Sequence, residues 1–458
     1  MSKSLHVIVL AAGQGTRMRS SLPKVLQPLG GRPLLTHVVE AAEALEPARI
    51  HVVYGHGASQ VQSALGYLDV NWVLQEQQLG TGHAVDQAMA DVPDDGEVLV
   101  LYGDVPLIKS HSLKDLLTAG SDEALALLTL VVDEPGSYGR ILRDDDNRVV
   151  GIVEAKDATR DQLFINEINT GIMCAPAKQL RSWLAQLNND NAQGEYYLTD
   201  VVALAAQAGT RVVAGQAGSP DEVQGINNKA DLAVAERVLQ RQHAEALLEA
   251  GVTLRDPARF DQRGTVTAGA DVSIDVNVVL EGEVILGDGV TIGPNCVLRN
   301  CRIGNRTNIL PSSVIEHAVI GDNCQVGPFA RLRPGTVMEA RSKVGNFVET
   351  KKSRLGVNSK VGHLAYVGDA TVGADVNIGA GVITCNYDGA NKHETIVGDG
   401  AFVGSNSSLV APVEIGSHAT IGAGSVITKN APPNTLTVSR NRQSSIDGWS
   451  RPRKKLSQ

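Results

Sequence analysis

Short apolar runs alternate with amphipathic stretches over the first half of the chain, from about residue 6 to residue 230. The runs predict buried strands and the stretches predict helices: 7–10, 50–54 and 98–102 for strands, 34–45 and 83–89 for helices. Such alternation favours βαβ units and a mostly parallel sheet with helices on both faces. We therefore expect an α/β domain over residues 1–228, with ligands at the carboxyl ends of its strands.

Residues 228–250 contain neither proline nor glycine, and their apolar positions recur at spacings near 3.6 residues. This pattern predicts a single long helix that ends at Gly251. We expect residues 229–250 to form a rigid linker helix between two domains.

Beyond this helix the period of the hydrophobic pattern changes to six residues. Aliphatic residues recur at this spacing through most of 274–427, and many are followed by glycine, as in Ile320-Gly321 and Val344-Gly345. Hexads of this kind predict a parallel β-helix, in which the aliphatic side chain of each hexad points into a triangular coil. We expect glycine or asparagine at the corners, where a positive φ costs these residues little. Residues 251–458 are thus predicted to form an all-β, left-handed parallel β-helix with a C-terminal tail.

The six-residue spacing lengthens twice along the β-helix, around residues 346–354 and around residues 386–394. We expect a loop to leave the coil at each place. Loops on a rigid scaffold are frequent locations of binding sites, so both segments become candidates for chemistry.

Composition narrows the possible functions. The 47 glycines and the low aromatic content of 3% suit a narrow, turn-rich β-helix, and the net charge of −9 argues against binding to nucleic acid or to an anionic membrane. No apolar run is long enough to cross a bilayer, and residues 1–10 lack the pattern of a secretion signal. We therefore expect a cytoplasmic protein. The five cysteines form no CxxC pair, which predicts neither a zinc site nor a disulfide framework.

A glycine-containing loop follows the first predicted strand. Gly13 and Gly15 would let backbone N–H groups approach phosphate oxygens, and Arg17 and Lys24 would add positive charge. A loop of this kind can also be only a tight turn, and it matches neither the Walker A sequence nor the dinucleotide fingerprint. The loop alone is therefore weak evidence for a phosphate site.

Two further segments point to the same chemistry. Gln75 supplies an amide that could pair with the edge of a pyrimidine, and Gly80 opens a turn into the next helix. Asp104 follows the strand that ends at Tyr102, where a carboxylate can hold Mg²⁺ against phosphates. A lone aspartate there is more often a cap or turn residue, but its combination with a phosphate loop favours a metal ligand.

Polar residues near the lengthened spacings suggest chemistry on the β-helix too. Arg333 and Lys351 bring positive charge suited to a sugar phosphate. His363 follows a hexad glycine, which predicts an outward-facing position at a corner. A solitary histidine is usually an ordinary surface residue, but beside Tyr366 and Asn377 it could be a general base that takes the proton of an amine as the amine attacks a thioester.

The segments 13–24, 79–84 and 102–107 together resemble the sugar-1-phosphate nucleotidyltransferases, which have a Rossmann-like fold. With 195–200, 225–228 and the hexapeptide half added, the chain is similar from residue 5 to about residue 450 to the bacterial bifunctional N-acetylglucosamine-1-phosphate uridyltransferase and glucosamine-1-phosphate acetyltransferase family.

This resemblance implies an enzyme of UDP-N-acetylglucosamine biosynthesis. The C-terminal domain would transfer acetyl from acetyl-CoA to glucosamine-1-phosphate. The N-terminal domain would transfer UMP from UTP to N-acetylglucosamine-1-phosphate and release pyrophosphate. The resemblance also implies Mg²⁺, a homotrimer, and a product used for peptidoglycan, lipopolysaccharide, the cell wall and cell shape.

The resemblance also implies roles for individual residues. In the N-terminal domain, Arg17 and Lys24 would be catalytic, and Asp104 and Asn227 would ligate Mg²⁺. The residues implied to bind nucleotide and sugar are Leu10, Ala11, Ala12, Gly13, Lys24, Gln75, Gly80, Thr81, Tyr102, Gly103, Asp104, Gly139, Glu154, Asn169 and Asn227.

In the C-terminal domain, His363 would be the base of acetyl transfer. The residues implied to bind glucosamine-1-phosphate are Arg333, Lys351, Tyr366 and Asn377. Those implied to bind acetyl-CoA, in a groove between neighbouring prisms of a trimer, are Ala380, Asn386, Tyr387, Ser405, Ala423 and Arg440.

Two other functions compete with this interpretation. The first is a sugar-1-phosphate nucleotidyltransferase with a single activity, whose β-helix is structural or regulatory. His363 together with Asn386 and Tyr387 at a lengthened spacing argues against it. The second is a structural or binding solenoid fused to an inactive sugar-nucleotide sensor, which the phosphate loop with Lys24 and Asp104 disfavours.

Overall fold

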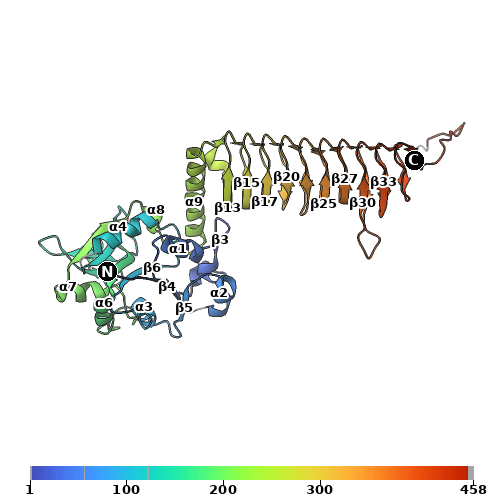
Figure 1. Ribbon diagram of the computed structural model, residues 1–458. Helices are drawn as coiled ribbons and strands as arrows, with labels where there is room; N and C mark the ends of the chain where they lie inside the picture. Colours follow the sequence, from blue (N-terminus) through green and yellow to red (C-terminus); the bar gives the residue numbers. More distant parts are fainter. Residues whose placement is uncertain (1–2, 56, 121–122, 452–458) are drawn as a thin grey trace, which may run out of the picture. The chain divides into compact units, whose positions relative to one another are not determined.

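The computed structural model describes residues 3–55, 57–120 and 123–451 of the 458-residue chain. Its internal contacts divide the chain into two compact units, Met1–Gln242 and His243–Gln458 (Figure 1). The division falls within one long helix, α9 (Lys229–Glu249).

Within the described residues, a nine-stranded sheet forms the centre of the first unit (Figure 1). Its main path runs β11 (Val212–Gln216), β7 (Leu125–Val131), β10 (Glu167–Pro176), β6 (Glu97–Tyr102), β1 (Leu5–Ala11), β4 (Arg49–Tyr54) and β5 (Asn71–Leu74). Neighbouring strands on this path are parallel except at β10, which is antiparallel to both β6 and β7. The predicted mostly parallel sheet is therefore confirmed.

Helices cover both faces of this sheet. Alternate residues of β1 enter opposite hydrophobic clusters, Val7 and Val9 on one side and Ile8 on the other, because successive strand side chains point in opposite directions. The first cluster includes residues of α1 (Leu34–Glu43), α2 (Ala58–Leu65) and α4 (Ser110–Gly120). The second includes residues of α3 (Thr81–Met89), α6 (Ala177–Leu184) and α7 (Asp200–Gln207). The predicted strands and helices differ from these by at most two residues at either end.

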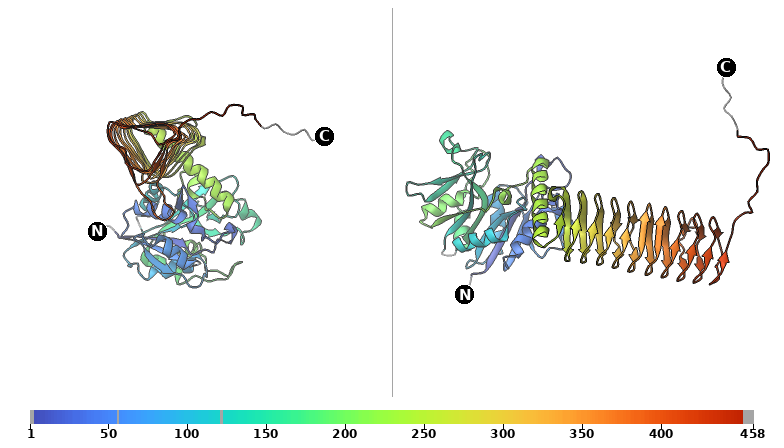
Figure 2. Two further views of the ribbon diagram at one scale, coloured as in Figure 1. Left: turned by 90° about the vertical axis from the view of Figure 1, so that its right-hand side faces the viewer. Right: turned by 90° about the horizontal axis from the view of Figure 1, so that it is seen from above.

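The second unit is a parallel β-helix, as predicted. Seen end-on in Figure 2, its coils superimpose as a triangle. One flat sheet follows the order β12-β14-β16-β18-β21-β24-β26-β28-β31-β34-β36, and the strands of the other two faces form a second sheet. Ile274 pairs with Ile292, and Ile292 pairs with Ile309 in the next coil, so the inward aliphatic residues stack in columns. These three side chains are at most 2% exposed.

The hexad glycines have a different role from the one expected. Asparagines such as Asn323 and Asn358 do have positive φ, as predicted for corners. Gly321 and Gly345, which follow inward aliphatic residues, are not among the positive-φ residues. A Cβ atom at Gly345 would lie 1.9 Å from the carbonyl oxygen of Gly362 in the next coil. These glycines are required because the coils stack too closely for a side chain.

One of the two expected loops does not exist. Residues 346–354 stay in the coil, with β24 (Lys343–Asn346) followed directly by β25 (Glu349–Leu355). The prediction was wrong because a threonine fills the inward position. Thr350 is fully buried, and its hydroxyl lies 3.0 Å from that of Thr336. The second loop is present, since residues 386–394 leave the coil between β29 (Ile383–Cys385) and β30 (Thr395–Val397) (Figure 1).

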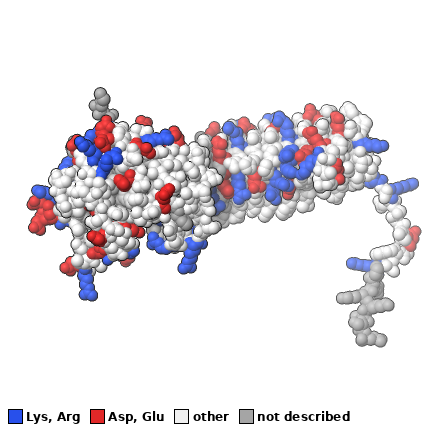
Figure 3. All heavy atoms as spheres, turned by 90° about the horizontal axis from the view of Figure 1, so that it is seen from below, with Lys and Arg blue, Asp and Glu red and all other residues white. Residues whose placement is uncertain are grey.

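Acidic and basic side chains mingle on the face of the β-helix seen in Figure 3. Many of them pair between successive coils, as where Arg299 lies 2.9 Å from Glu281 and 3.0 Å from Glu316. Among the residues that the structure describes, no helix has both the length and the apolar character needed to span a membrane.

Candidate functional site

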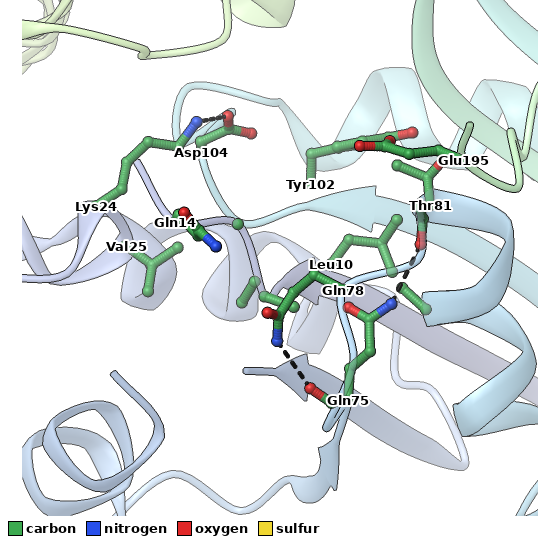
Figure 4. A pocket seen from close by; sticks show the side chains of 15 residues that line it. Leu10, Gln14, Lys24, Val25, Gln75, Gln78, Thr81, Tyr102, Asp104 and Glu195 are labelled. Carbon is green, nitrogen blue, oxygen red and sulfur yellow. Dashed lines mark hydrogen bonds and ion pairs between the residues drawn. The ribbon is translucent and has the colours of Figure 1, made fainter. Parts of the chain in front are cut away.

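A cavity of about 470 Å³ lies in the first unit at the carboxyl ends of β1 and β6 (Figure 4). It contains most of the residues predicted to bind the nucleotide: Leu10, Ala11, Ala12, Gly13, Lys24, Gln75, Gly80, Thr81, Tyr102 and Asp104. Five more line it that sequence analysis did not single out: Gln14, Val25, Gln78, Ala84 and Glu195. Gln14 could have been found from its place between Gly13 and Gly15.

The loop after β1 folds back toward Lys24. Gly15 has a φ of 61°, and a Cβ atom there would lie 2.6 Å from the Cβ atom of Lys24, so only glycine allows this approach. At Gly13, by contrast, a Cβ atom would have no neighbour within 4 Å. The backbone of the loop therefore borders open space, as a phosphate-binding loop requires.

A cluster of charged and polar groups lies at one end of the cavity. The Lys24 ammonium forms an ion pair with Asp104 and donates to Oδ1 of Asn227 at 3.2 Å. Arg17 donates to the same oxygen at 2.8 Å. Asp104 and Asn227 are held together because the N–H of Ile226 donates to the carbonyl oxygen of Asp104 at 2.9 Å. The structure thus brings together both predicted catalytic cations and both predicted metal ligands.

The donor atoms of Asp104 and Asn227 fit a magnesium ion. Both are oxygens, which Mg²⁺ prefers, and both now contact the cation of Lys24. No group of three or more His, Cys, Asp or Glu side chains is placed to hold a metal in the described part of the chain. Two protein oxygens suit Mg²⁺ when water and substrate phosphates complete its coordination.

The three residues predicted to bind the sugar lie near one another, outside the cavity lining. Asn169 donates its N–H to the carbonyl oxygen of Gly139 at 2.9 Å, and a Cβ atom at Gly139 would lie 3.4 Å from Oε1 of Glu154. Burial raises the pKa of Glu154, against the effect of a hydrogen bond from Thr199. Burial likewise raises the pKa of Tyr102, and the nearby Glu154 carboxylate adds to this rise.

Gly103 is also outside the cavity lining. Its N–H donates to the carbonyl oxygen of Leu10 at 2.9 Å, and the residue is buried. The backbone N–H of Gly103, a residue that the resemblance implied to bind nucleotide or sugar, is therefore already used within the fold.

In the second unit, Arg333, Lys351 and Tyr366 come from successive coils on one face of the β-helix. In β25 and β27 (Tyr366–Val372), Lys351 lies opposite Gly368. Arg333 donates to Glu349 at 2.8 Å. The ring of Tyr366 lies over Gly368, where a Cβ atom would be 2.3 Å from the tyrosine hydroxyl. Glycine at this position lets the ring lie flat beside the cations.

A third cation joins this face from the loop at 386–394. Tyr387 and Lys392 form an antiparallel bridge that folds the loop back on itself. The proximity of Lys392 lowers the pKa of Lys351, the charge of Arg333 lowers it too, and Asp369 opposes them. Neighbouring like charges disfavour the charged form of each group, so an anion bound between them would be stabilising. Sequence analysis missed Lys392, although its place in the predicted loop was a usable signal.

His363 ends strand β26 (Lys360–His363) and is exposed, as predicted. Its Nδ1 lies 2.5 Å from Oδ1 of Asn346 in the preceding coil. An amide oxygen only accepts, so Nδ1 carries the proton and Nε2 keeps its lone pair. This is the tautomer that a general base needs at Nε2.

Asn377 is not brought to the Arg333–Lys351 face within one chain. It lies in β28 (Asn377–Ile378), opposite Lys360, in the other sheet of the β-helix.

Four of the residues predicted to bind acetyl-CoA, Ala380, Ser405, Ala423 and Arg440, form a row along the coils. The N–H of Asn406 donates to the carbonyl oxygen of Ala380 at 2.7 Å, and the N–H of Gly424 donates to that of Ser405 at 2.8 Å. The side chain of Arg440 donates to the carbonyl oxygen of Ala423 at 2.7 Å. Asn386 is buried and donates to Asp369, whereas Tyr387 is 60% exposed in the loop.

Comparison with known proteins covers nearly the whole chain. Three relatives described as "Bifunctional protein GlmU" come from Alkalilimnicola ehrlichii, Marinobacter nauticus and Stenotrophomonas maltophilia. The first is 57% identical over 452 residues, which is 99% of this chain and 97% of the relative. The second is 56% identical over 450 residues, 98% of this chain and 99% of the relative. The third is 57% identical over 456 residues, 99% of this chain and 100% of the relative. The chain belongs to the GlmU family.

Family models match the two halves of the chain separately. A MobA-like NTP transferase domain matches residues 7–198, a GMPPB C-terminal domain matches 262–348, and a bacterial transferase hexapeptide (six repeats) matches 394–429. Membership of the GlmU family confirms the predicted bifunctional enzyme, with a uridylyltransferase and an acetyltransferase activity. The two competing functions, which lack one or both activities, are thereby set aside.

Proposed function

We propose that the two activities divide as follows. Residues 1–228 transfer UMP from UTP to N-acetylglucosamine-1-phosphate with release of pyrophosphate, and residues 229–250 link this domain to the next. Residues 251–458 transfer acetyl from acetyl-CoA to glucosamine-1-phosphate. The observation that carries the first assignment is the convergence of Lys24, Asp104 and Asn227 on one point of the cavity.

In uridylyl transfer, a phosphate oxygen of the sugar phosphate attacks the α-phosphorus of UTP in line with the departing pyrophosphate. This chemistry depends mainly on position and on neutralised charge. Gln75, Gly80 and Thr81 bind the base, and Lys24 and Arg17 offset the charge of the phosphates. Mg²⁺, held by Asp104 and Asn227, supplies further charge neutralisation when bound. Gly139, Glu154 and Asn169 bind the N-acetylated sugar beyond Tyr102.

In acetyl transfer, Nε2 of His363 takes a proton from the amine as the amine attacks the thioester carbon of acetyl-CoA. Asn346 supports the assignment because it holds the proton of His363 on Nδ1. The phosphate of glucosamine-1-phosphate lies between Arg333 and Lys351, with Lys392 as a third cation. Acetyl-CoA lies along the row of Ala380, Ser405, Ala423 and Arg440, and Asn386 and Tyr387 also bind it.

The acetyltransferase site needs more than one chain. Asn377 and the Arg333–Lys351 face belong to different sheets of the same β-helix, and a flat face offers little concavity. A homotrimer would place Asn377 of one protomer near the cations of the next. We further propose a cytoplasmic enzyme that acts on small molecules only, and whose product serves peptidoglycan and lipopolysaccharide synthesis and hence cell-wall formation and cell shape.

Two single variants of the full-length protein test the division. Asp104→Ala should lower pyrophosphate release from UTP and N-acetylglucosamine-1-phosphate by at least about 100-fold and leave release of free CoA unchanged. His363→Ala should do the reverse, with a loss of about 100-fold or more in CoA release. Equal loss of both activities in either variant would contradict two separate sites. Sedimentation of the unaltered protein as a monomer or dimer would contradict the trimer.

A further inference from the structure

The amide of Gln75 is a buried, hydrogen-bonded polar group in the lining of the nucleotide cavity. Gln75 directly follows β5, lines the cavity, and is only 2% exposed. Its backbone N–H donates to Tyr54 at 2.8 Å, and its carbonyl oxygen accepts from Gln78 at 3.0 Å. The main chain is thus fixed on both sides, and only the side-chain amide remains free to choose between two orientations.

Two acceptors determine which end of this amide faces the cavity. Nε2 of Gln75 donates to the carbonyl oxygen of Gly80 at 3.2 Å (Figure 4) and lies 2.9 Å from Nδ1 of His83. Because an amide nitrogen only donates, this contact requires that Nδ1 accepts and that the proton of the neutral ring is on Nε2. An amide nitrogen has two protons, so both are used. A rotation by 180° about the end of the side chain would put Oε1 against the carbonyl oxygen of Gly80 and leave the protons of Nε2 without these partners.

The two acceptors are themselves held in place. Gly80 precedes α3, and its carbonyl oxygen also accepts from the N–H of Ala84 at 3.1 Å. A Cβ atom at Gly80 would lie 2.6 Å from the carbonyl oxygen of Tyr196, so this residue cannot move far. His83 lies in the first turn of α3, with its Nε2 3.4 Å from the amide nitrogen of Gln87 one turn later. A neutral ring accepts at one nitrogen only, and the shorter contact with Gln75, at 2.9 Å, assigns that role to Nδ1.

We infer that His83 is a positioning residue that selects uracil over cytosine without touching the base. By accepting the second proton of Gln75, His83 helps to keep Oε1 as the only hydrogen-bonding group that this amide turns toward the cavity. Uracil presents a donor, its N3–H, to such an oxygen. Cytosine presents an unprotonated N3, whose lone pair would face the lone pairs of Oε1. The inference rests on the proposed function, because it requires that the cavity binds UTP.

His83 is suited to act through Gln75 and not on the nucleotide directly. It is absent from the cavity lining and faces a separate hollow with Leu74, Glu76, Gln77 and Gln87. The amide of Gln75 lies between the two spaces.

The test compares kcat/KM for UTP and for CTP in full-length variants. His83→Phe keeps a ring but removes the acceptor. In this variant, the rotated orientation of the Gln75 amide therefore loses one hydrogen bond fewer than it does in the unaltered protein. The ratio of the two kcat/KM values should fall by about 2- to 12-fold, the equivalent of one neutral hydrogen bond. His83→Asn can place a side-chain oxygen near the former position of Nδ1 and should restore most of the ratio. Equal loss with both nucleotides would show a merely structural role and would overturn the inference.

Two control variants separate this inference from the proposed function. Gln87→Leu removes the contact at the outer nitrogen of the His83 ring and should leave the UTP/CTP ratio unchanged. Gln75→Met removes the amide itself and should lower the ratio more than His83→Phe does. A ratio that responds to Gln75→Met but not to His83→Phe would overturn the role of His83 and leave the proposed function intact.

Other outcomes would contradict the proposed function itself. If neither His83→Phe nor Gln75→Met changed the UTP/CTP ratio, the amide of Gln75 would not bind the base. That result would overturn both the inference and the proposed role of this cavity. If His83→Phe lost all turnover, calorimetric affinities for UTP and CTP would replace kcat/KM, and the fluorescence of Trp72 and Trp183, which pack in the first unit, would check that this unit is folded. Equal affinity losses would again refute the inference.

Discussion

A buried pair of histidines should make the first unit sensitive to acid. His6 in β1 and His51 in β4 are 7% and 1% exposed, and Nδ1 of His6 lies 3.1 Å from Nε2 of His51. Their rings stack with centroids 5.4 Å apart. Asn71 lies 3.1 Å from the other ring nitrogen of His51 and also donates to Asp91. A proton added to His51 would therefore enter a site that is enclosed and already hydrogen-bonded.

The lowered pKa of His51 gives the size of this sensitivity to acid. Burial lowers it from 6.5 to about 4; the neighbouring His6 and Arg49 lower it too, and Asp91 opposes them. The pKa of His6 is also lowered by burial. Between pH 6.5 and 4 the unfolded chain thus binds more protons than the folded one, so the free energy of unfolding falls as the pH falls. For His51 alone, the loss between pH 7.5 and pH 5 is about 2 kcal/mol.

Urea unfolding of the full-length protein at pH 7.5 and pH 5.0 measures this loss. Tryptophan fluorescence reports the first unit, because Trp72 and Trp183 pack there and Trp449, the third tryptophan, is 68% exposed. A control with both His6→Gln and His51→Gln keeps polar side chains but removes the titration. The difference between the two pH values should be smaller in this control by about 2 kcal/mol. An equal difference in both proteins would refute the reasoning, because carboxylates elsewhere would then explain it.

Three further changes test single contacts. Asn346→Leu removes the acceptor of the His363 Nδ1 proton and should lower kcat for CoA release by about 10- to 100-fold, with pyrophosphate release as the unchanged control. Gly171 has a φ of 87°, and the Cβ atom of Gly171→Ala would lie 2.5 Å from Cε2 of Tyr102. This variant should displace the tyrosine ring and raise KM for both substrates of uridylyl transfer. Unchanged KM values would contradict the contact. Lys392→Ala should raise KM for glucosamine-1-phosphate by about tenfold but leave KM for UTP unaltered, and an unaffected KM for the amino sugar would remove this lysine from the site.

The fold could be predicted because its two periodic patterns are strong. Alternating strands and helices indicated the α/β unit, and hexads indicated the β-helix. The predictions failed at positions where the same residue type can be required for either of two structural reasons. Thr350 is polar and so broke the aliphatic pattern, yet its hydroxyl pairs inside the coil with that of Thr336. Gly345 matched the expectation of a corner glycine, but the close carbonyl of Gly362 is what requires it.

The candidate sites could be predicted only in part. Residues on the loop after β1 and at the end of β6 were accessible to sequence reasoning, because parallel strands present their carboxyl ends at one edge. Glu195 and Lys392 were missed because a loop returns each of them to a site built by distant residues. His83 lies in the segment 79–84, which contributes to the resemblance, but its contact with Gln75 depends on how α3 is placed against β5.

The two sites prepare for a phosphate in opposite ways. In the first unit, Lys24 is already paired with Asp104, so an incoming phosphate must compete with a carboxylate or share it with a metal ion. In the second unit, Lys392 lies close enough to Lys351 to lower its pKa, and an anion placed between them would relieve their repulsion. A metal ion would be useful in the first case, because it would convert the Asp104 carboxylate from a competitor into a ligand. In the second case, the phosphate of the proposed amino-sugar substrate would itself supply the negative charge between the lysines.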